Sequence, residues 1–290
     1  MDHPTNRRKP LARAALTLAA ALAFAATTEG ATPLLPQLER VSVSAAGQQS
    51  NGSSLTLAAP PLDSRRMLSQ DGRYVVFDSA ASNLVPNDMN GNTDVFVRDR
   101  LADVTERVSV DSAGNEALGD SYSAEISADG RWIVFVSTAA NLDPADLNGA
   151  SDVFLHDRQT GTTTRVSVAV GGGDPDGASF EPAISADGGR GAFASLASNL
   201  VTDDDNGVAD VFVVDLASGT TDRVSVAAGG GSPDAPSGGP ALSGDGDRIA
   251  FVSRATNLVP GAQPAGVDDV FVLERSSGTV TKISTRANGS

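Results

Sequence analysis

One unit of sequence is repeated four times along this chain, and this repeat restricts the fold more than any other feature. The pattern Ser-x-Asp-Gly begins at positions spaced 58 residues apart, namely Ser69, Ser127, Ser185 and Ser243. Other markers recur in each unit: an isolated Phe, an Asn-Leu pair, Asp-Val-Phe, and an Arg-Val-Ser-Val that starts at Arg40, Arg107, Arg165 and Arg223 and degenerates at Lys282. Such a chain must bury the apolar side chains of each unit against the neighbouring units.

Each unit predicts four short strands. In the second unit we expect them near 124–127 and at 131–137, 152–157 and 163–168. Asp129-Gly130 is a tight-turn signal between the first two strands, and the second strand is rich in β-branched and aromatic residues. The unit therefore predicts an all-β protein.

The second strand is apolar on both faces, as in Ile133-Val134-Phe135-Val136. A strand that is buried on both sides needs a sheet stacked on each face of its own sheet. Four-stranded sheets repeated around an axis satisfy this need, and the sequence predicts a β-propeller of four 58-residue blades. A β-solenoid or a β-sandwich is the alternative, but solenoid rungs are shorter and a sandwich does not repeat one unit.

The units run approximately over 40–106, 107–164, 165–222 and 223–285, within a propeller domain at 40–290. The first unit has nine extra residues before its Ser-x-Asp-Gly. A fifth copy of the fourth strand lies at 40–44. It either contributes to ring closure or pairs with 55–57 as a partial fifth blade.

The first 25 residues have the layout of a secretory signal peptide, followed by a linker at 26–39. Arg7, Arg8 and Lys9 precede an apolar run, which ends in the small-x-small pattern Ala23-Phe24-Ala25. The run is short for a membrane anchor, which needs about 20 apolar residues. We therefore expect a periplasmic or secreted protein without membrane insertion, exported by the general or the twin-arginine route.

The charge balance excludes some partners. The chain has 36 acidic and 21 basic residues, a net charge of −15, so nucleic acid and anionic membranes would repel it. It has no cysteine, which excludes disulfides, thiolate metal sites and cysteine nucleophiles.

The segment Ser127-Ala128-Asp129-Gly130-Arg131, followed by an apolar strand with a central Phe, resembles the propeller repeats of TolB and related exported bacterial proteins. The resemblance covers 40–284 and implies a WD-type propeller fold. TolB has an additional N-terminal domain for which this chain has no room, so the resemblance does not extend to a TolB role in envelope transport.

Extra length is added to one end of each predicted blade. The turns after the first and third strands are short, whereas the loops after the second and fourth strands are long and acidic or Gly-rich. Loops on a rigid scaffold are common binding sites, so we expect ligands at the long-loop end.

The sharpest candidate site is an Asp-x-Asn-Gly-x-x-Asp pattern in the loop before the third strand of units one to three. The candidate metal ligands are Asp88, Asn90, Asp94, Asp146, Asn148, Asp152, Asp204, Asn206 and Asp210. Closely spaced acidic side chains and a Gly for a sharp turn resemble the middle of an EF-hand calcium loop. The first-position Asp and the twelfth-position Glu are missing, and the fourth unit should not bind. The alternative is structural, because Asn-Gly is also a turn dipeptide and Asp caps backbone amides.

Other chemical candidates are weaker. His156 is the only histidine after the signal and is predicted to be a variable strand residue, which argues against a Ser-His-Asp triad. Carboxylates recur at the ends of the third strands, at Asp99, Asp157, Asp215 and Glu274. Paired carboxylates can hydrolyse glycosides, but their repeated placement favours a structural bond between blades.

The sequence therefore predicts a non-enzymatic binding or scaffold propeller outside the cytoplasm, with a protein or glycan ligand and calcium as its candidate cofactor. A carbohydrate-active propeller hydrolase or lyase is the alternative function. A third interpretation is a piece of a longer propeller array that associates with itself.

Overall fold

The computed structural model describes residues 38–54, 66–261 and 265–285. All the regular secondary structure in these ranges is β-strand. The fifteen strands are β1 (Tyr74–Ser79), β2 (Asp94–Asp99), β3 (Val104–Arg107), β4 (Ser121–Ile126), β5 (Trp132–Ser137), β6 (Asp152–Asp157), β7 (Thr162–Arg165), β8 (Ser179–Ile184), β9 (Arg190–Ser195), β10 (Asp210–Asp215), β11 (Thr221–Arg223), β12 (Ser237–Leu242), β13 (Arg248–Ser253), β14 (Asp269–Glu274) and β15 (Thr279–Lys282). The predicted signal peptide, most of the linker and the strand at 55–57 lie outside the described residues. None of the described segments forms a helix that could span a membrane.

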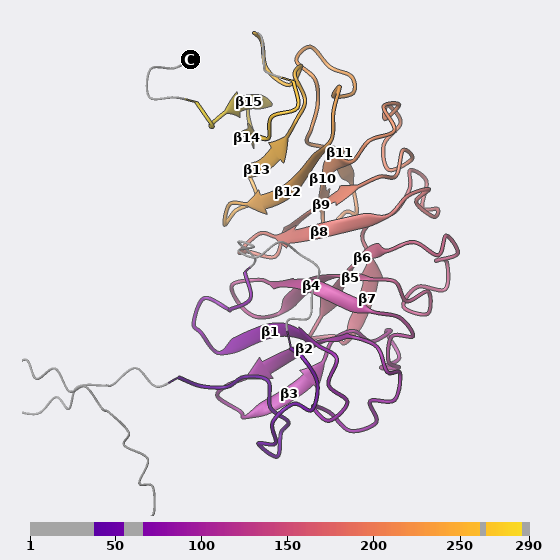
Figure 1. Ribbon diagram of the computed structural model, residues 1–290, viewed down its shortest axis with the longest axis vertical. Coiled ribbons are helices and arrows are strands. Elements are labelled where there is room, and N and C mark those ends of the chain that lie inside the picture. Colours follow the sequence, from indigo (N-terminus) through magenta and orange to yellow (C-terminus); the bar gives the residue numbers. More distant parts are fainter. Residues whose placement is uncertain (1–37, 55–65, 262–264, 286–290) are drawn as a thin grey trace, which may run out of the picture. The chain divides into compact units, whose positions relative to one another are not determined.

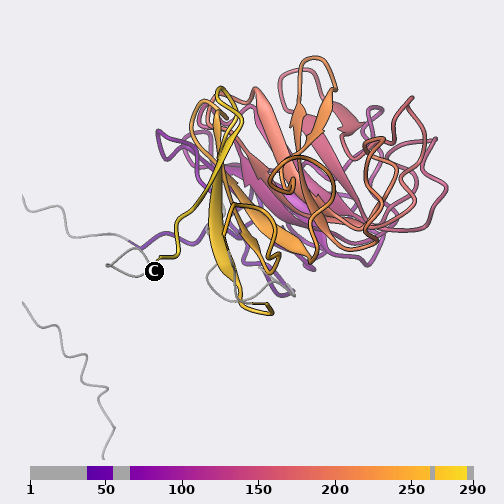
Figure 2. The same cartoon turned by 90° about the horizontal axis from the view of Figure 1, so that it is seen from above.

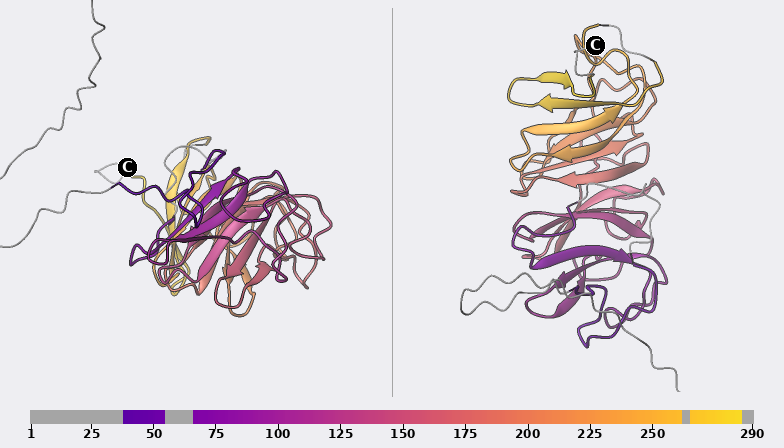
Figure 3. Two further views of the ribbon diagram at one scale, coloured as in Figure 1. Left: turned by 90° about the horizontal axis from the view of Figure 1, so that it is seen from below. Right: turned by 60° about the vertical axis from the view of Figure 1, so that its left-hand side comes forward.

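The strands form four antiparallel sheets, one for each repeat, in chain order (Figure 1). The second, third and fourth sheets have four strands each, and β1–β3 form the first. The right-hand view of Figure 3 shows the sheets one above another from β3 to β15. This arrangement confirms the predicted all-β, propeller-type fold of four repeated sheets. Closure of these sheets into a ring stays a prediction.

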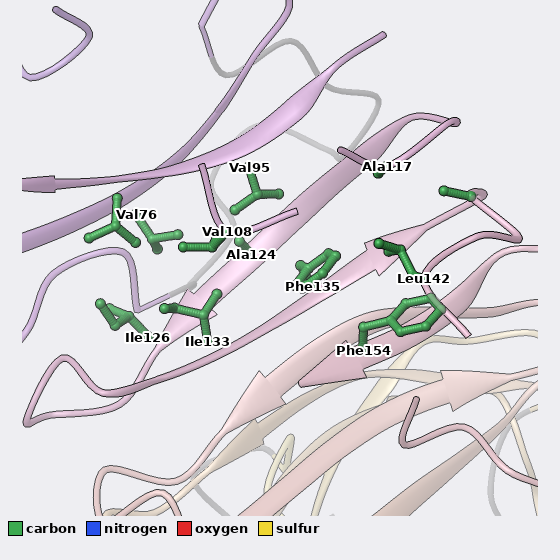
Figure 4. Close-up of a cluster of buried hydrophobic side chains, with 12 residues drawn as sticks. Val76, Val95, Val108, Ala117, Ala124, Ile126, Ile133, Phe135, Leu142 and Phe154 are labelled. Atoms are coloured by element: carbon green, nitrogen blue, oxygen red, sulfur yellow. The ribbon is translucent and has the colours of Figure 1, made fainter. Parts of the chain in front are cut away.

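Each sheet contacts the preceding one chiefly through its first strand, as in the pairs β1–β4, β5–β8 and β9–β12. Ile133 and Phe135 of β5 point toward the first sheet, where they meet Val76 and Val95 (Figure 4). The intervening Val134 and Val136 belong to the cluster shared with the third sheet. The strand is therefore apolar on both faces because both faces are covered, as the sequence predicts.

A pair of stacked phenylalanines recurs in every sheet between the second and third strands. The ring centroids lie 5.7–5.9 Å apart in the pairs Phe77–Phe96, Phe135–Phe154, Phe193–Phe212 and Phe251–Phe271. These pairs explain two of the repeated sequence markers, the isolated Phe and Asp-Val-Phe. Offset aromatic pairs at this distance stabilise a core beyond the area that they bury.

The Ser-x-Asp-Gly marker forms the turn between the first and second strands. Ser127 Oγ donates to Asp129 Oδ1 and accepts the amide of Trp132, while Asp129 Oδ1 accepts the amide of Arg131. Consecutive turns are also joined to one another. The amide of Gln70 donates to the carbonyl of Ala128, and the amide of Ala128 donates to the carbonyl of Ala186. The marker therefore fixes both the hairpin and the spacing of neighbouring sheets.

The first sheet is preceded by a partial copy of a unit. Ser54 and Leu68 form bridges to Ser79 and Val75, at the edge where the other sheets place their first strand. The extra residues of the first unit therefore lie between Ser54 and Leu68. Thr105 Oγ1 donates to the carbonyl of Val43, so the fifth copy at 40–44 lies next to β3. Its role in ring closure is still a prediction.

The unequal ends of the sheets are as predicted. The connections β4–β5 and β6–β7 are short turns, whereas β5–β6 and β7–β8 are long loops. The long connections project on the right-hand side in Figures 1 and 2. All the residues of the candidate metal loops are therefore presented at one end of the sheets.

Candidate functional site

The Asp-x-Asn-Gly-x-x-Asp loops connect the second and third strands of the first three sheets. In the second sheet, Asn148 Oδ1 accepts the amide of Ala150, and Asn148 Nδ2 donates to the carbonyl of Pro175 and to Asp152 Oδ2. Gly149 follows with a φ of 66°, a left-handed conformation that glycine adopts without strain. The Asn therefore shapes the turn and ties it to the following long loop. The same contacts recur at Asn90 and Asn206.

The last Asp of each loop is the first residue of a third strand and is completely buried. Asp152 Oδ1 accepts a hydrogen bond of 2.6 Å from Ser167 Oγ, and Ser109 and Ser225 make the same bond to Asp94 and Asp210. These serines belong to the Arg-Val-Ser-Val marker. Their bonds explain why that marker recurs in step with Asp-Val-Phe.

The arginine of the same marker lies inside each acidic cluster. Arg165, with a side chain only 2% exposed, places Nη1 3.7 Å from Asp146 Oδ1 and 3.3 Å from Asp152 Oδ2, and also pairs with Asp174. Its Nε lies 3.0 Å from Asp143 Oδ2. Arg107 and Arg223 lie in the same way among the acidic groups of the first and third sheets. A buried guanidinium therefore offsets part of the negative charge of each cluster.

These arginines are not among the site residues predicted from the sequence, nor is the acidic residue nine positions after two of them, Glu116 and Asp174. The signal was present, because the Arg markers recur in step with the Asp loops. The fourth unit has a lysine instead, and Lys282 Nζ lies 2.7 Å from Asp269 Oδ2.

Three carboxylates of the second sheet could also surround a metal ion. Ligand atoms of Asp146, Asp152 and Asp174 lie within 4.8 Å of one another. Asp146 Oδ1 is buried and makes no hydrogen bond, only the long ion pair to Arg165. Two of the nine predicted ligands are thus brought together with a third carboxylate that was not predicted. Asn148 directs its carbonyl oxygen to the backbone instead.

Burial governs the acidity of the clustered carboxyl groups. Burial, reinforced by the nearby Asp152, raises the pKa of Asp146 to about 6, and burial also raises the pKa of Asp210 to about 6. The pKa values of Asp88, Asp94, Asp152 and Asp204 are raised in the same direction, again chiefly by burial. In each cluster the arginine therefore does not offset the whole cost of burying the carboxylates in their charged form.

The carboxylates at the ends of the third strands have a different role. The prediction that they join neighbouring blades is wrong, because each pairs with an arginine of its own sheet. Arg131 donates two hydrogen bonds of 2.8 Å to Asp157, and the others are Arg73–Asp99, Arg190–Asp215 and Arg248–Glu274. The second and third strands are adjacent in register here, so the pair forms across one sheet.

His156 is 5% exposed and lies on β6, with Nδ1 2.9 Å from Thr163 Oγ1. Burial lowers its pKa. This placement fits the predicted strand residue rather than a catalytic base.

Exposed apolar side chains stand at the tips of the metal-type loops. Met89 is 80% exposed and Leu147 is 85% exposed, although both follow a buried or nearly buried Asp in the loop. The amides of both residues are held by the acidic partner of the next loop, Glu116 and Asp174. These side chains are therefore displayed on backbone that is fixed by the Arg clusters.

No family model and no curated protein matches this sequence. Among solved structures, TolB from Acinetobacter baumannii is similar at 16% identity and a TM-score of 0.45, over 82% of this chain and 45% of that chain. Putative TolB from Agrobacterium tumefaciens is similar at 17% identity and a TM-score of 0.47, over 83% and 78% of the two chains. An oligogalacturonate lyase in complex with manganese gives 13% identity and a TM-score of 0.46, over 77% and 52%.

This chain thus spans about half the length of the Acinetobacter TolB and of the lyase. In its fold, the chain is similar to the TolB-like β-propellers, which is the resemblance indicated by its Ser-x-Asp-Gly-Arg repeat.

Proposed function

We propose that this protein is a non-enzymatic binding scaffold outside the cytoplasm, and that it binds a protein partner through the long-loop end of its sheets. The display of Met89 and Leu147 carries this proposal. Both are almost fully exposed, yet their loops are held by a buried arginine with several carboxylates. Methionine is enriched at protein interfaces, and the two apolar side chains occupy equivalent positions on loops of adjacent sheets.

The partner class follows from the chemistry of these tips. They are aliphatic or thioether side chains surrounded by acidic loops, which complements an apolar patch with a basic rim on another protein. Because the backbone is already ordered, binding would lose little conformational entropy. A glycan ligand is less well matched by aliphatic tips.

The test is capture of partners from envelope and culture-supernatant fractions on the immobilised exported protein, compared with a Met89→Ser/Leu147→Ser variant. Leu101→Ser is the matched control, because Leu101 is 78% exposed in the turn between β2 and β3, at the opposite end. We expect a defined set of bound proteins that the double variant loses and the control keeps. Equal capture by all three proteins would remove the proposal.

Calcium binding in the loops is a second proposal, supported by the convergence of Asp146, Asp152 and Asp174. An ion bound there must displace the Arg165 guanidinium from these oxygens. Calorimetric titration with calcium therefore tests it, alone and with Asp146→Asn. No heat and no thermal shift at millimolar calcium would leave the loops with a structural role only.

A carbohydrate-active hydrolase or lyase is the alternative function, and the likeness to an oligogalacturonate lyase names the substrate to test first. Turnover of oligogalacturonate by the exported protein, with and without a divalent cation, decides between enzyme and scaffold.

A further inference from the structure

A cleft of about 550 Å³ lies between the third and fourth sheets, where their outer strands β11 and β15 face each other. Its walls are mainly apolar, with Val224 from the third sheet and Leu258, Leu273 and Val280 from the fourth unit. Its size is within the range of about 300–1,000 Å³ that is usual for small-molecule sites. The cleft is separate from the Met89 and Leu147 loops and does not depend on the function proposed above.

The corresponding junction between the first and second sheets is joined by polar side chains. Thr163 Oγ1 donates to the carbonyl of Val110 and contacts His156 Nδ1, and its amide donates to Ser112 Oγ. A groove of about 600 Å³ is also present there, and it is lined by groups such as Ser112, Thr164 and Arg165. Strand-to-loop hydrogen bonds therefore hold that junction together at its outer edge.

Three positions distinguish the junction of the third and fourth sheets from that of the first and second, and the junction of the second and third sheets is intermediate, with Val170, Val214 and Thr221 at these places. Leu273 occupies the place of His156, Val280 that of Thr163, and Ala228 that of Ser112. In both sheets the two strand residues are direct cross-strand neighbours, so the replacement changes a contiguous surface. None of the three new side chains can form the lost hydrogen bonds, and the cleft has an apolar wall in their place.

Arg275 lies at the mouth of the cleft and makes only a long ion pair there. Arg275 Nη2 lies 3.6 Å from Asp222 Oδ2, and both residues line the cleft. The equivalent pair between the first two sheets, Arg158 and Glu106, is closer at 2.5 Å. A planar guanidinium donates in parallel to the two oxygens of a carboxylate, and a ligand at the mouth could replace the long contact to Asp222.

We propose that this cleft binds a small amphipathic carboxylate, with its aliphatic body between Leu258, Leu273 and Val280 and its carboxylate on Arg275. Gly229 and Gly230 form part of the rim, and their φ values of 94° are available to glycine without strain. Burial of an aliphatic chain covers apolar walls that water otherwise contacts, and this supplies the driving force.

The experiment is calorimetric titration of the exported protein with decanoate, and in parallel with decanol as the uncharged probe. Leu273→His/Val280→Thr restores the residues of the second sheet and should lower decanoate affinity at least about tenfold, equivalent to ~1.4 kcal/mol. Arg275→Gln should weaken decanoate by a similar factor and leave decanol unchanged.

Val270→Thr is the matched control, because it changes the opposite face of the same sheet, where Val270 is 38% exposed. It should bind decanoate as the unaltered protein does. The proposal is overturned if the unaltered protein binds no decanoate, if the double variant binds it equally well, or if Val270→Thr abolishes binding.

Discussion

At the scale of single residues, a buried arginine lies among buried carboxylates in each of the first three sheets. Arg165 lies where an ion would lie among Asp146, Asp152 and Asp174. Removal of one member of such a cluster leaves the others buried and uncompensated, which is far more costly than the loss of an exposed pair. The arginines therefore matter for the order of the loops that carry Met89 and Leu147.

Arg165→Met tests this role, because it removes the guanidinium and keeps an apolar stem of similar length. We expect the free energy of unfolding in urea to fall by about 3–5 kcal/mol. Arg248→Met is the control, since Arg248 pairs with Glu274 at a site where its side chain is 62% exposed. It should change stability little. Equal losses in the two variants would contradict an ordering role for the buried cluster.

The raised pKa of Asp146, about 6, predicts an unusual dependence of stability on pH. The folded state binds this proton more tightly than the unfolded state, whose pKa is near the ordinary 3.8. The stability that this group contributes is therefore complete below that ordinary value and lost as the pH rises through about 6. Thermal melting should occur at higher temperature at about pH 5 than at about pH 7, and Asp146→Asn should reduce the difference.

The opposite change is expected in stronger acid. The bond from Arg73 lowers the pKa of Asp99 to about 2 and the bond from Arg131 lowers that of Asp157. These pairs stabilise the fold above the ordinary Asp pKa and lose their effect as the pH falls toward the lowered values. A melting temperature that fell steadily from neutral pH downward would contradict the raised value for Asp146.

At the scale of structural elements, the Ser-x-Asp-Gly turn combines a local conformation with a contact to the neighbouring sheet. Gly188 has a φ of 72°, and a Cβ there would lie 2.3 Å from Cδ1 of the Trp132 ring in the preceding sheet. Gly149, in the long loop, has a φ of 66° and open space around the same position. Both glycines have the left-handed backbone conformation, but only Gly188 is packed against an aromatic ring.

Gly149→Ala and Gly188→Ala should therefore destabilise the protein by different amounts. Both should lose about 1–2 kcal/mol from the left-handed backbone. Gly188→Ala should lose roughly 1–3 kcal/mol more from overpacking. The fluorescence of Trp132, the only tryptophan in the chain, should change only in Gly188→Ala. The same spectrum in both variants would show that the ring does not contact this turn.

Elements were predictable where the pattern is local. The bounds of β6, Asp152–Asp157, agree with the prediction to the residue, and the short turns and long loops lie as expected. The candidate site was predicted only in part. Arg165 reaches the Asp loop because the β6–β7 register sets it opposite Phe154, and Asp174 arrives from the next long loop. These side-chain contacts depend on which residues pair across neighbouring strands, and the spacing of motifs along the chain does not reveal that pairing.

At the scale of the whole chain, the fourth sheet has one face that no further sheet covers among the described residues. Three apolar side chains on it are 38–53% exposed, namely Val252, Val270 and Ile283. The equivalent residues of the second sheet are at most 9% exposed, namely Val136, Val153 and Val166. A face that is built like the buried ones and left open favours association with a second copy of the chain.

Sedimentation velocity over a range of concentrations tests this association. We expect the unaltered protein to form a dimer reversibly, and Val270→Lys/Ile283→Lys to remain monomeric. Val104→Lys is the control, because Val104 is 44% exposed on β3 of the first sheet. It should associate as the unaltered protein does. A strict monomer at every concentration would remove self-association from the interpretation.

The chain of amide-to-carbonyl bonds between successive turns, from Gln70 to Ala128 and from Ala128 to Ala186, has a consequence for how such proteins grow. The first two junctions use the same donor and acceptor positions, and at the third junction the amide of Asp187 donates to the carbonyl of Gly244. All three bonds join backbone groups and are independent of the side chains. A duplicated or deleted unit would thus meet a compatible backbone on both sides without compensating mutations. Gene-level changes in unit number should therefore be tolerated more readily than substitutions of the side chains at a junction.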